Sequence, residues 1–450
     1  MKNILLVDCE LKYIDSVLNY TDITISVLIT MKYNDVSRYE KNPRVKKIIF
    51  DKNFDNNDDL EYFEYNDIQK FSSAQLKSEY YFKRKFLDYQ YEKYSYYRGL
   101  ALVKKIFVEN VIDAVIICNL NHGLVFDSLI VEMSNLLEIP NFNIGPMIYE
   151  KLIIYDNLHS KILEVNSSSM DYNNSLFYKI NFDDDKFLWN SKSIFKNTIR
   201  KLFYKFGGWL GLEFLWCVRR CDLGTDDYGI NYIDRLSNYL KLKILKWKLD
   251  RNSSVFNKNI NYIFFALHLE PEATISDRAI MDSQIIAIKM LANSLPEGWK
   301  IYVKEHPHQF QCNTVFLNLF LYNSIIFKSK KFYNEIRKLK NVEFIKTSES
   351  SEELIKYSKA VATMSGTVIL EAAKLNKPVM IFSAARTIYN DISGFYKITS
   401  YKDCEKAVND ILKRKYINYS DIDKICSKYL IEDNKNGYNK AINIIYNTIS

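Results

Sequence analysis

Two regions of alternating strand and helix patterns constrain the fold of this 450-residue chain more than any other feature. In each region, short apolar runs that resemble buried strands alternate with amphipathic segments that resemble helices. This alternation is typical of strand–helix–strand units, whose strands pair in parallel with helices on both faces of the sheet. Because the middle of the chain lacks the alternation, the sequence predicts two α/β lobes with a linker or insertion between them.

The first region, residues 1–150, is predicted to form a Rossmann-like, doubly wound domain. Strands are expected at Asn3–Val7, Ile23–Ile29, Val45–Phe50, Asp113–Ile117 and Pro140–Ile144, and helices over Ser78–Glu109 and Leu124–Leu137. Strands that are apolar along their whole length are buried on both faces, as the strands of parallel sheets are. The first region should therefore carry helices on both sides of its sheet.

The second region, residues 259–450, is predicted to form another Rossmann-like domain. Strands are expected at Asn261–Leu267, Trp299–Lys304, Val342–Ile345, Ala360–Met364 and Pro378–Phe382, and helices over Ala279–Ser294 and Thr367–Leu375. Residues 151–258 are assigned to a linker or helical insertion. Two doubly wound domains that face a central cleft describe the GT-B architecture, in which ligands lie outside the carboxyl ends of the strands.

Net charge limits the classes of partner that the chain is expected to bind, and cysteine content indicates its location. Its 62 Lys and Arg residues against 54 Asp and Glu give a net charge of +8. This excess is too mild to predict a nucleic-acid partner, but it suits a protein that handles anionic ligands or rests near an anionic membrane. The odd, dispersed set of seven cysteines predicts reduced thiols and a cytoplasmic location.

The turn Lys304-Glu305-His306-Pro307 follows a predicted buried strand. Pro307 has no N–H for strand pairing, so it ends the strand and forces a turn. Lys304 and His306 then lie at the strand's carboxyl end, where they would clamp the phosphate of a bound donor through charge-assisted hydrogen bonds. His306 would also stabilise charge on a departing nucleotide, and the alternative is an ordinary polar turn.

The segment Ser365-Gly366-Thr367 lies between a predicted strand and a predicted helix. Gly366 lets the backbone approach a ligand closely, and Ser365 or Thr367 is expected to cap the helix. Glu371 lies one helical turn beyond Thr367, where it would accept hydrogen bonds from ribose hydroxyls. Simple helix capping is the alternative for this segment. Its pairing with the lysine- and histidine-bearing turn favours a donor site.

Two carboxylates and an imidazole follow the first strand of the second region, at His268, Glu270 and Glu272. Carboxylates near a transferring sugar act as nucleophile, general base or general acid. We predict Glu272 to be the chemical carboxylate ahead of Glu270, and His268 to face the acceptor. The alternative is a solvated loop.

The matching turn of the first region contains His122 and precedes the helix that contains Asp127. These two residues are predicted to contact an acceptor sugar, although a histidine in such a turn is often only a surface residue.

The stretch Ser193–Arg220 mixes basic residues with Phe, Leu and Trp. Such a mixture suits an interfacial helix on anionic lipid. It also suits a buried helical hairpin with Gly207 and Gly208 at its turn. Both interpretations stay open.

Several of these motifs together resemble the bacterial capsular polysaccharide biosynthesis family, which includes the Kdo transferases of capsule assembly. The resemblance rests on Phe265–Ala273, Lys304–Pro307, Ala362–Thr367 with Glu371, and Lys377–Val379. It covers residues 260–400 well and the first half only in outline. It implies a GT-B fold, no metal, and transfer of a sugar to a surface glycan or its lipid carrier. The same motifs resemble those of GT-B sialyltransferases, which implies that His306, Ser365 and Thr367 hold the phosphate of a CMP-sugar.

Together these observations predict a cytoplasmic, peripheral glycosyltransferase of capsule or lipopolysaccharide assembly at the inner face of the bacterial inner membrane. Its expected donor is a CMP-linked acidic sugar such as Kdo, and its expected acceptor is a glycan or lipid-linked oligosaccharide. One alternative keeps the enzyme class but uses a UDP- or GDP-sugar. Another is a non-catalytic glycan-binding or export partner.

Overall fold

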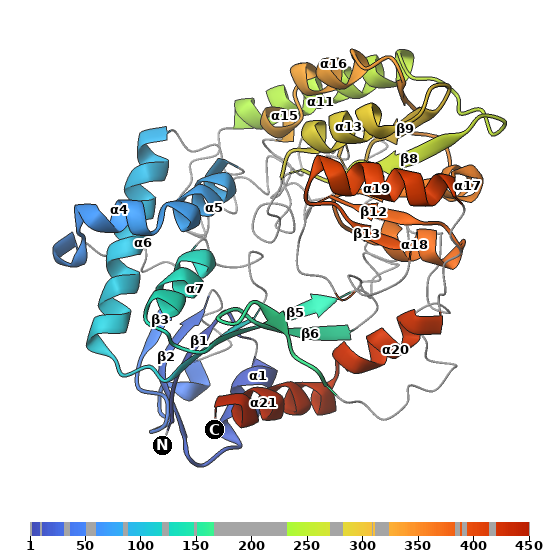
Figure 1. Ribbon diagram of the computed structural model, residues 1–450. Helices are drawn as coiled ribbons and strands as arrows, with labels where there is room; N and C mark the ends of the chain where they lie inside the picture. Colours follow the sequence, from blue (N-terminus) through green and yellow to red (C-terminus); the bar gives the residue numbers. More distant parts are fainter. Residues whose placement is uncertain are drawn as a thin grey trace, which may run out of the picture.

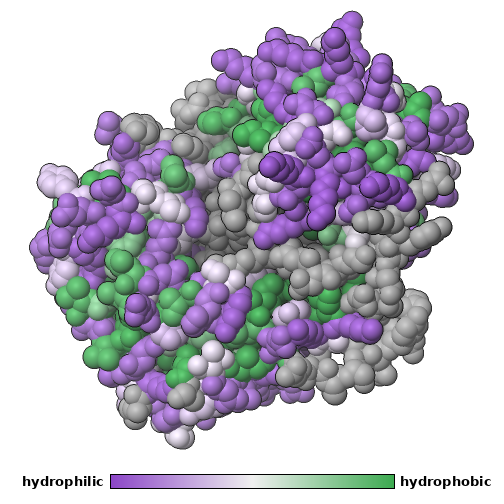
Figure 2. Space-filling model, viewed as in Figure 1, coloured by the Kyte–Doolittle hydropathy of each residue, from purple (hydrophilic) through white to green (hydrophobic). Residues whose placement is uncertain are grey.

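The computed structural model describes residues 2–9, 11–30, 37–50, 60–83, 89–118, 126–147, 151–165, 232–270, 282–307, 309–310, 324–382, 388, 394–413 and 420–449. These residues form two lobes, each built around one sheet with helices on both faces (Figure 1). On the face shown in Figure 2, hydrophilic side chains cover most of the coloured surface of both lobes. The predicted α/β class with two Rossmann-like lobes is confirmed.

The first sheet has the order β14-β6-β5-β4-β1-β2-β3, with β7 paired to β6. Its parallel strands are β1 (Lys2–Val7), β2 (Ile23–Thr30), β3 (Ile48–Phe50), β4 (Ala114–Cys118) and β5 (Asn141–Met147). Three further strands extend it in antiparallel pairs: β6 (Lys151–Asp156), β7 (Lys161–Ile162) and β14 (Ile431–Glu432). All five strands predicted for this region are confirmed. The antiparallel strand β6 was not predicted and lies in the range assigned to the linker.

Alternate residues of β1 face opposite layers of helices, because successive strand side chains point to opposite faces. Ile4 and Leu6 pack with α1 (Leu11–Leu18) and α21 (Lys435–Ile449). Leu5 and Val7 pack against the layer on the other face. That layer contains α5 (Ser72–Lys83), α6 (Tyr89–Glu109) and α7 (Asp127–Leu136), with α4 (Tyr65–Lys70) beside α5 and η2 (Leu60–Tyr62) beside α6. The short η1 (Ser37–Tyr39) belongs to the other layer, where Tyr39 packs with α1.

The second sheet is parallel throughout, in the order β10-β9-β8-β11-β12-β13. Its strands are β8 (Tyr262–Ala266), β9 (Lys300–Lys304), β10 (Val342–Phe344), β11 (Ala360–Thr363), β12 (Val379–Ile381) and β13 (Phe395–Lys397). The first five match the predicted strands. Only the last was not predicted.

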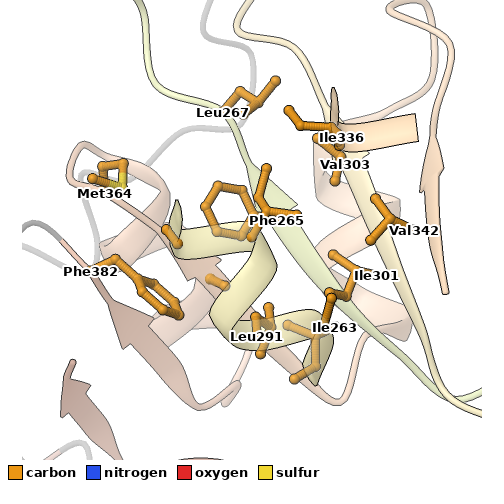
Figure 3. Close-up of a cluster of buried hydrophobic side chains, with 14 of the residues drawn as sticks. Ile263, Phe265, Leu267, Leu291, Ile301, Val303, Ile336, Val342, Met364 and Phe382 are labelled. Atoms are coloured by element: carbon orange, nitrogen blue, oxygen red, sulfur yellow. The ribbon is translucent and has the colours of Figure 1, made fainter. Parts of the chain in front are cut away.

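Two helical layers cover this sheet. One core holds Ile263 and Phe265 of β8 together with α11 (Tyr232–Arg251), α13 (Gln284–Ser294), α16 (Lys330–Arg337) and α19 (Tyr401–Leu412). Figure 3 shows part of this core, with Leu291 of α13 and Ile336 of α16. The opposite face packs on α17 (Ser351–Tyr357), α18 (Val368–Lys374) and α20 (Ser420–Tyr429). The short α15 (Ser324–Phe327) lies beside α11.

Both sheets reverse their direction of growth at one point. From β1 the chain adds β2 and β3 on one side and then places β4 on the other side. From β8 it adds β9 and β10, and then places β11 on the other side. Ligands of doubly wound sheets bind outside the strand carboxyl ends at such a switch point. The β1/β4 and β8/β11 switch points are therefore the two places where the fold favours a site.

The C-terminal segment returns to the first lobe. Strand β14 pairs with β6, and α21 packs on α1, where Lys12 Nζ donates to Tyr438 Oη at 2.7 Å. Gly437 permits this return, because a Cβ there would lie 1.7 Å from the backbone oxygen of Glu432. The predicted domain boundaries stay predictions. The structure adds that β14 and α21 contact the first lobe, although the sequence analysis placed them in the second domain, residues 259–450.

Candidate functional site

The ends of β8 and β11 bring two predicted site segments together. The single O–H of Thr363 lies within hydrogen-bond distance of two backbone oxygens, that of Ala266 at 3.2 Å and that of Ser365 at 2.9 Å, and so connects the two strand ends. Gly366 has a φ of +108°, and a Cβ built on it would lie 4.0 Å from Nε2 of His268. The imidazole of His268 therefore lies at the Ser365–Thr367 turn, at the β8/β11 switch point.

The start of α18 differs in one detail from the sequence prediction. Thr367 occupies the position before the helix, but its side chain makes no capping hydrogen bond. Its Oγ1 donates instead to Oε1 of Glu371 at 3.0 Å. Capping by Thr367 was therefore a wrong prediction. Thr367 and Glu371 are one helical turn apart, and this hydrogen bond fixes the orientation of the buried Glu371 carboxylate.

Lys304 is buried at the end of β9, on the side of the sheet that α17 covers. Its Nζ donates to Oγ of Ser351 at 2.7 Å. Burial lowers the pKa of the Lys304 ammonium, and the nearby carboxylates of Glu371 and Glu349 oppose that shift. The cation thus lies among groups that already compensate its charge. Direct contact with a donor phosphate stays a prediction for this residue.

Glu305, the next residue, is buried on the opposite side of the sheet. Its Oε1 accepts from Nζ of Lys328 at 2.7 Å, and both side chains are fully excluded from solvent. Its Oε2 accepts from the hydroxyl of Tyr333 at 2.7 Å. Lys328 also donates to the backbone oxygen of His268. One buried ion pair therefore connects the loop after β8 to the turn after β9.

Two glutamines complete this buried network. Gln284 accepts from the backbone N–H of His268 at 2.8 Å and donates to the Glu270 carboxylate. Gln309 exchanges two hydrogen bonds with the Glu270 backbone, at 3.0 and 2.8 Å. Burial raises the pKa of Glu270, while the neighbouring Lys328 ammonium acts against this shift. The carboxylate is thus held inside the loop rather than presented at its surface.

The remaining predicted site residues have different positions. His306 is half-buried, and its backbone N–H donates to Glu305 at 2.8 Å, while Pro307 is exposed. Asp127 is completely buried in the first turn of α7. An acceptor sugar would reach it only after a rearrangement. Glu272, His122 and the stretch Ser193–Arg220 lie outside the described residues.

Sequence reasoning missed Lys328, Gln284 and Gln309, which hold the strand-end loops in place. Lys328 is 23 residues from Glu305 and 60 from His268, so no local spacing pattern connects them. Gln284 was within a correctly predicted helix, but its polar side chain gave no sign of its partner. Among the residues that the structure describes, no cluster of His, Cys, Asp and Glu fits a metal ion, and none of the helices is long and apolar enough to cross a membrane.

Comparisons with known proteins give remote structural matches only. No protein-family description matches the sequence, and no curated protein matches it. KpsC from Thermosulfurimonas dismutans, a β-Kdo 2,7 transferase, matches at 12% identity over 86% of this chain and 98% of its own, with a TM-score of 0.31. UDP-GlcNAc 2-epimerase from Methanocaldococcus jannaschii, in complex with UDP-GlcNAc and UDP, matches at 13% identity over the whole of both chains, with a TM-score of 0.28.

A third match is the ADP-heptose lipopolysaccharide heptosyltransferase II of E. coli, at 10% identity over 92% of this chain and 99% of its own, with a TM-score of 0.22. At such scores these likenesses carry no argument about function. The assignment of the fold rests on the strand order and parallel register of the two sheets.

Proposed function

We propose that the chain is a glycosyltransferase that takes a sugar from a nucleotide donor, with a CMP-linked acidic sugar such as Kdo as the donor. One observation carries the proposal: His268 and the glycine turn Ser365–Thr367 meet at the β8/β11 switch point. This is where doubly wound sheets bind nucleotides. The resemblance of these motifs to the capsular polysaccharide family supports the choice of donor and of a glycan or lipid-linked acceptor.

The side chains around this point suit a phosphate and a ribose. Gly366 has no side chain, so a phosphate oxygen is able to approach the backbone closely. His306 follows β9, the neighbour of β8 in the sheet, and we assign it as the hydrogen-bond donor that stabilises the charge on the departing nucleotide. Glu371, oriented by Thr367, accepts hydrogen bonds from ribose hydroxyls. Donor binding is thereby assigned to the second lobe, and acceptor binding to the first lobe together with His268 at the end of β8.

In the proposed reaction an acceptor hydroxyl attacks the anomeric carbon, the bond to the nucleotide phosphate breaks, and a carboxylate takes the hydroxyl proton. The burial of Glu270 and its bond to Gln284 make it a poor partner for an acceptor hydroxyl. These contacts favour Glu272 as the base. The proposed transfer requires no metal, because His306, the Ser365 hydroxyl and the backbone at the turn supply the hydrogen-bond donors for the phosphate.

Isothermal calorimetry with CMP, UDP and GDP tests the proposal. We expect CMP to bind more tightly than the other two nucleotides, in EDTA as well as in magnesium. Tighter binding of UDP or GDP would keep the enzyme class and change the donor. Binding that requires the metal would contradict the metal-free mechanism. If none of the three nucleotides binds at millimolar concentration, the transferase proposal fails and a glycan-binding or export role takes its place.

A further inference from the structure

Helix α11 has apolar side chains on two opposite faces. Leu242, Leu245 and Leu249 are buried in the core of the second lobe. Leu240, Ile244 and Trp247 recur at intervals of four and three residues, so they share the opposite face of the helix. Their exposed fractions are 52%, 53% and 57%. We call these three residues the α11 outer stripe.

Basic residues border the α11 outer stripe. Lys241, Lys248 and Arg251 are all exposed, and the guanidinium of Arg251 lies 5.2 Å from the centre of the Trp247 ring. The segment from Leu240 to Arg251 contains one acidic residue, Asp250. Its carboxylate is paired with Lys246 at 2.6 Å and accepts from Thr347, so its charge is compensated on the protein side of the helix.

We infer that the α11 outer stripe is a binding surface for an anionic lipid bilayer. Aliphatic and Trp side chains flanked by Lys and Arg are the composition of helices that lie in the membrane interface. Trp prefers this interface because its ring is apolar and its N–H is polar. The exposed charge on this face is positive, which complements anionic lipid headgroups. A nucleic acid would leave the aliphatic side chains without an apolar partner.

This surface deepens the proposed function, on which its biological meaning rests, because a transferase with a lipid-linked acceptor works at a membrane. Binding to lipid is nonetheless measured without any nucleotide or sugar. If the chain binds vesicles through α11 but binds no nucleotide, the proposed function is wrong and this inference stands. If it binds nucleotide but no vesicles, only this inference is wrong.

Co-sedimentation of the full chain with vesicles tests the inference. We expect binding to vesicles of phosphatidylglycerol and phosphatidylcholine at low salt, and weak binding to phosphatidylcholine alone. Neutralising Lys241, Lys248 and Arg251 to Gln should lower the partition coefficient on the order of 100-fold, since each basic residue contributes roughly fivefold. The variant L240S/I244S/W247S should also lose most of the binding.

Two matched controls show whether the location is right. L76S/V108S removes two apolar residues of the first lobe that are 69% and 70% exposed, and K402Q/K406Q/K424Q removes three exposed charges from α19 and α20. Both should bind vesicles as the unmodified chain does. Thermal unfolding of every variant should match that of the unmodified chain, because the changed side chains are exposed.

Three results would overturn the inference: no binding to anionic vesicles, equal losses in the controls, or unchanged binding in the α11 variants. The variant K196Q/R200Q/K201Q/K205Q gives a direct rival, because it tests the basic stretch that the sequence analysis singled out. If that variant alone abolishes binding, the membrane surface is not on α11. If the α11 variants instead change the oligomeric state on gel filtration and leave vesicle binding intact, the stripe is an interface between copies of the chain.

Discussion

The two switch points share one topology and differ in chemistry. At the β1/β4 point, Cys9 and Cys118 lie with their Sγ atoms 2.9 Å apart, buried among the apolar residues that pack on α1 and α21. At the β8/β11 point, an imidazole, hydroxyls and a glycine turn lie above a buried ion pair. The fold provides the same place twice. Among the described residues, only the second place carries groups that suit a phosphate.

The difference also shows how each place is held. The described part of the β1/β4 point is stabilised by apolar packing, which is non-directional. The β8/β11 point depends on Glu305 and Lys328, whose burial is costly unless each keeps its partner. Lys328 donates to the backbone oxygen of His268 and to the carboxylate of Glu305, the residue before His306, and these directional bonds fix both groups. The polar site is therefore held by buried polar bonds and the apolar one by packing. Mutations at the two switch points should differ in how much stability they cost.

The largest expected effect is on stability. Lys328→Met removes the partner of a fully buried carboxylate and should lower the free energy of unfolding by about 3–5 kcal/mol. Cys118→Ala at the other switch point should cost only about 1 kcal/mol, since it removes one buried sulfur. Urea unfolding measures both. The double variant E305Q/K328M should regain part of the loss, because no unpaired charge remains. Equal losses for Lys328→Met and Cys118→Ala would erase the proposed contrast in support.

The next effect is on turnover. His306→Ala should slow sugar transfer by about 10²–10³-fold, because it removes a donor that stabilises charge on the leaving nucleotide. Its melting temperature should not change, since the side chain is only half-buried. His159→Ala, which alters an imidazole that is 62% exposed in the first lobe, is the matched control and should be fully active. Product release is measured with the donor that calorimetry identifies. Normal turnover in His306→Ala would remove this residue from the site.

A smaller effect separates strain from binding. Gly366 and Gly298 both have positive φ, at +108° and +82°. Replacing either one by Ala should cost about 1–3 kcal/mol of stability through backbone strain. Only Gly366→Ala should also weaken nucleotide binding, because its new methyl group lies at the proposed phosphate position. Calorimetry with CMP on both variants decides the matter. A similar loss of affinity in both would mean that strain alone acts.

The smallest effect is a pH dependence. Burial raises the pKa of Glu270 above its ordinary value of 4.5, so the folded state holds this proton more tightly than the unfolded state does. The stability that this adds is fully present below the unfolded pKa and is lost as pH rises through the folded pKa. As pH rises from about 4 through the raised folded pKa, the unmodified chain should therefore lose stability relative to Glu270→Gln. Parallel pH profiles of the two chains would refute the raised pKa.

Much of the fold was predictable because its strands are apolar along their length. Tyr262–Ala266 and Ala114–Cys118 are buried on both faces, so their sequence pattern matches their structure. The strand Lys151–Asp156 was missed, since it starts with a lysine whose burial depends on Glu432 far along the chain. Helix α11 lies in the range assigned to a linker or helical insertion, but its bounds were not predicted. Its outer stripe is apolar as well as its inner face, so the usual contrast between faces is weak.

The site was predictable only where it follows a strand. His268 and Ser365–Thr367 were placed at strand ends, and parallel pairing of β8 with β11 brings those ends together. The support beneath them was not predictable, because Lys328 and Gln309 meet their partners through tertiary packing alone. Residues with buried polar partners carry no periodic pattern in the sequence. They appear only when the loops are placed in space.

The return of α21 to the first lobe has a consequence for the order in which the chain folds during synthesis. Tyr438 and Ile442 of α21 belong to the same core as Ile4 and Leu6. That core therefore lacks these packing partners until the ribosome has synthesised α21. Residues 260–412, which contain all strands of the second sheet, emerge earlier. At about 5–20 residues per second, the N-terminal lobe waits many seconds for its final helix. The lobe that is translated first is thus the one completed last, and chaperones would meet its unfinished face.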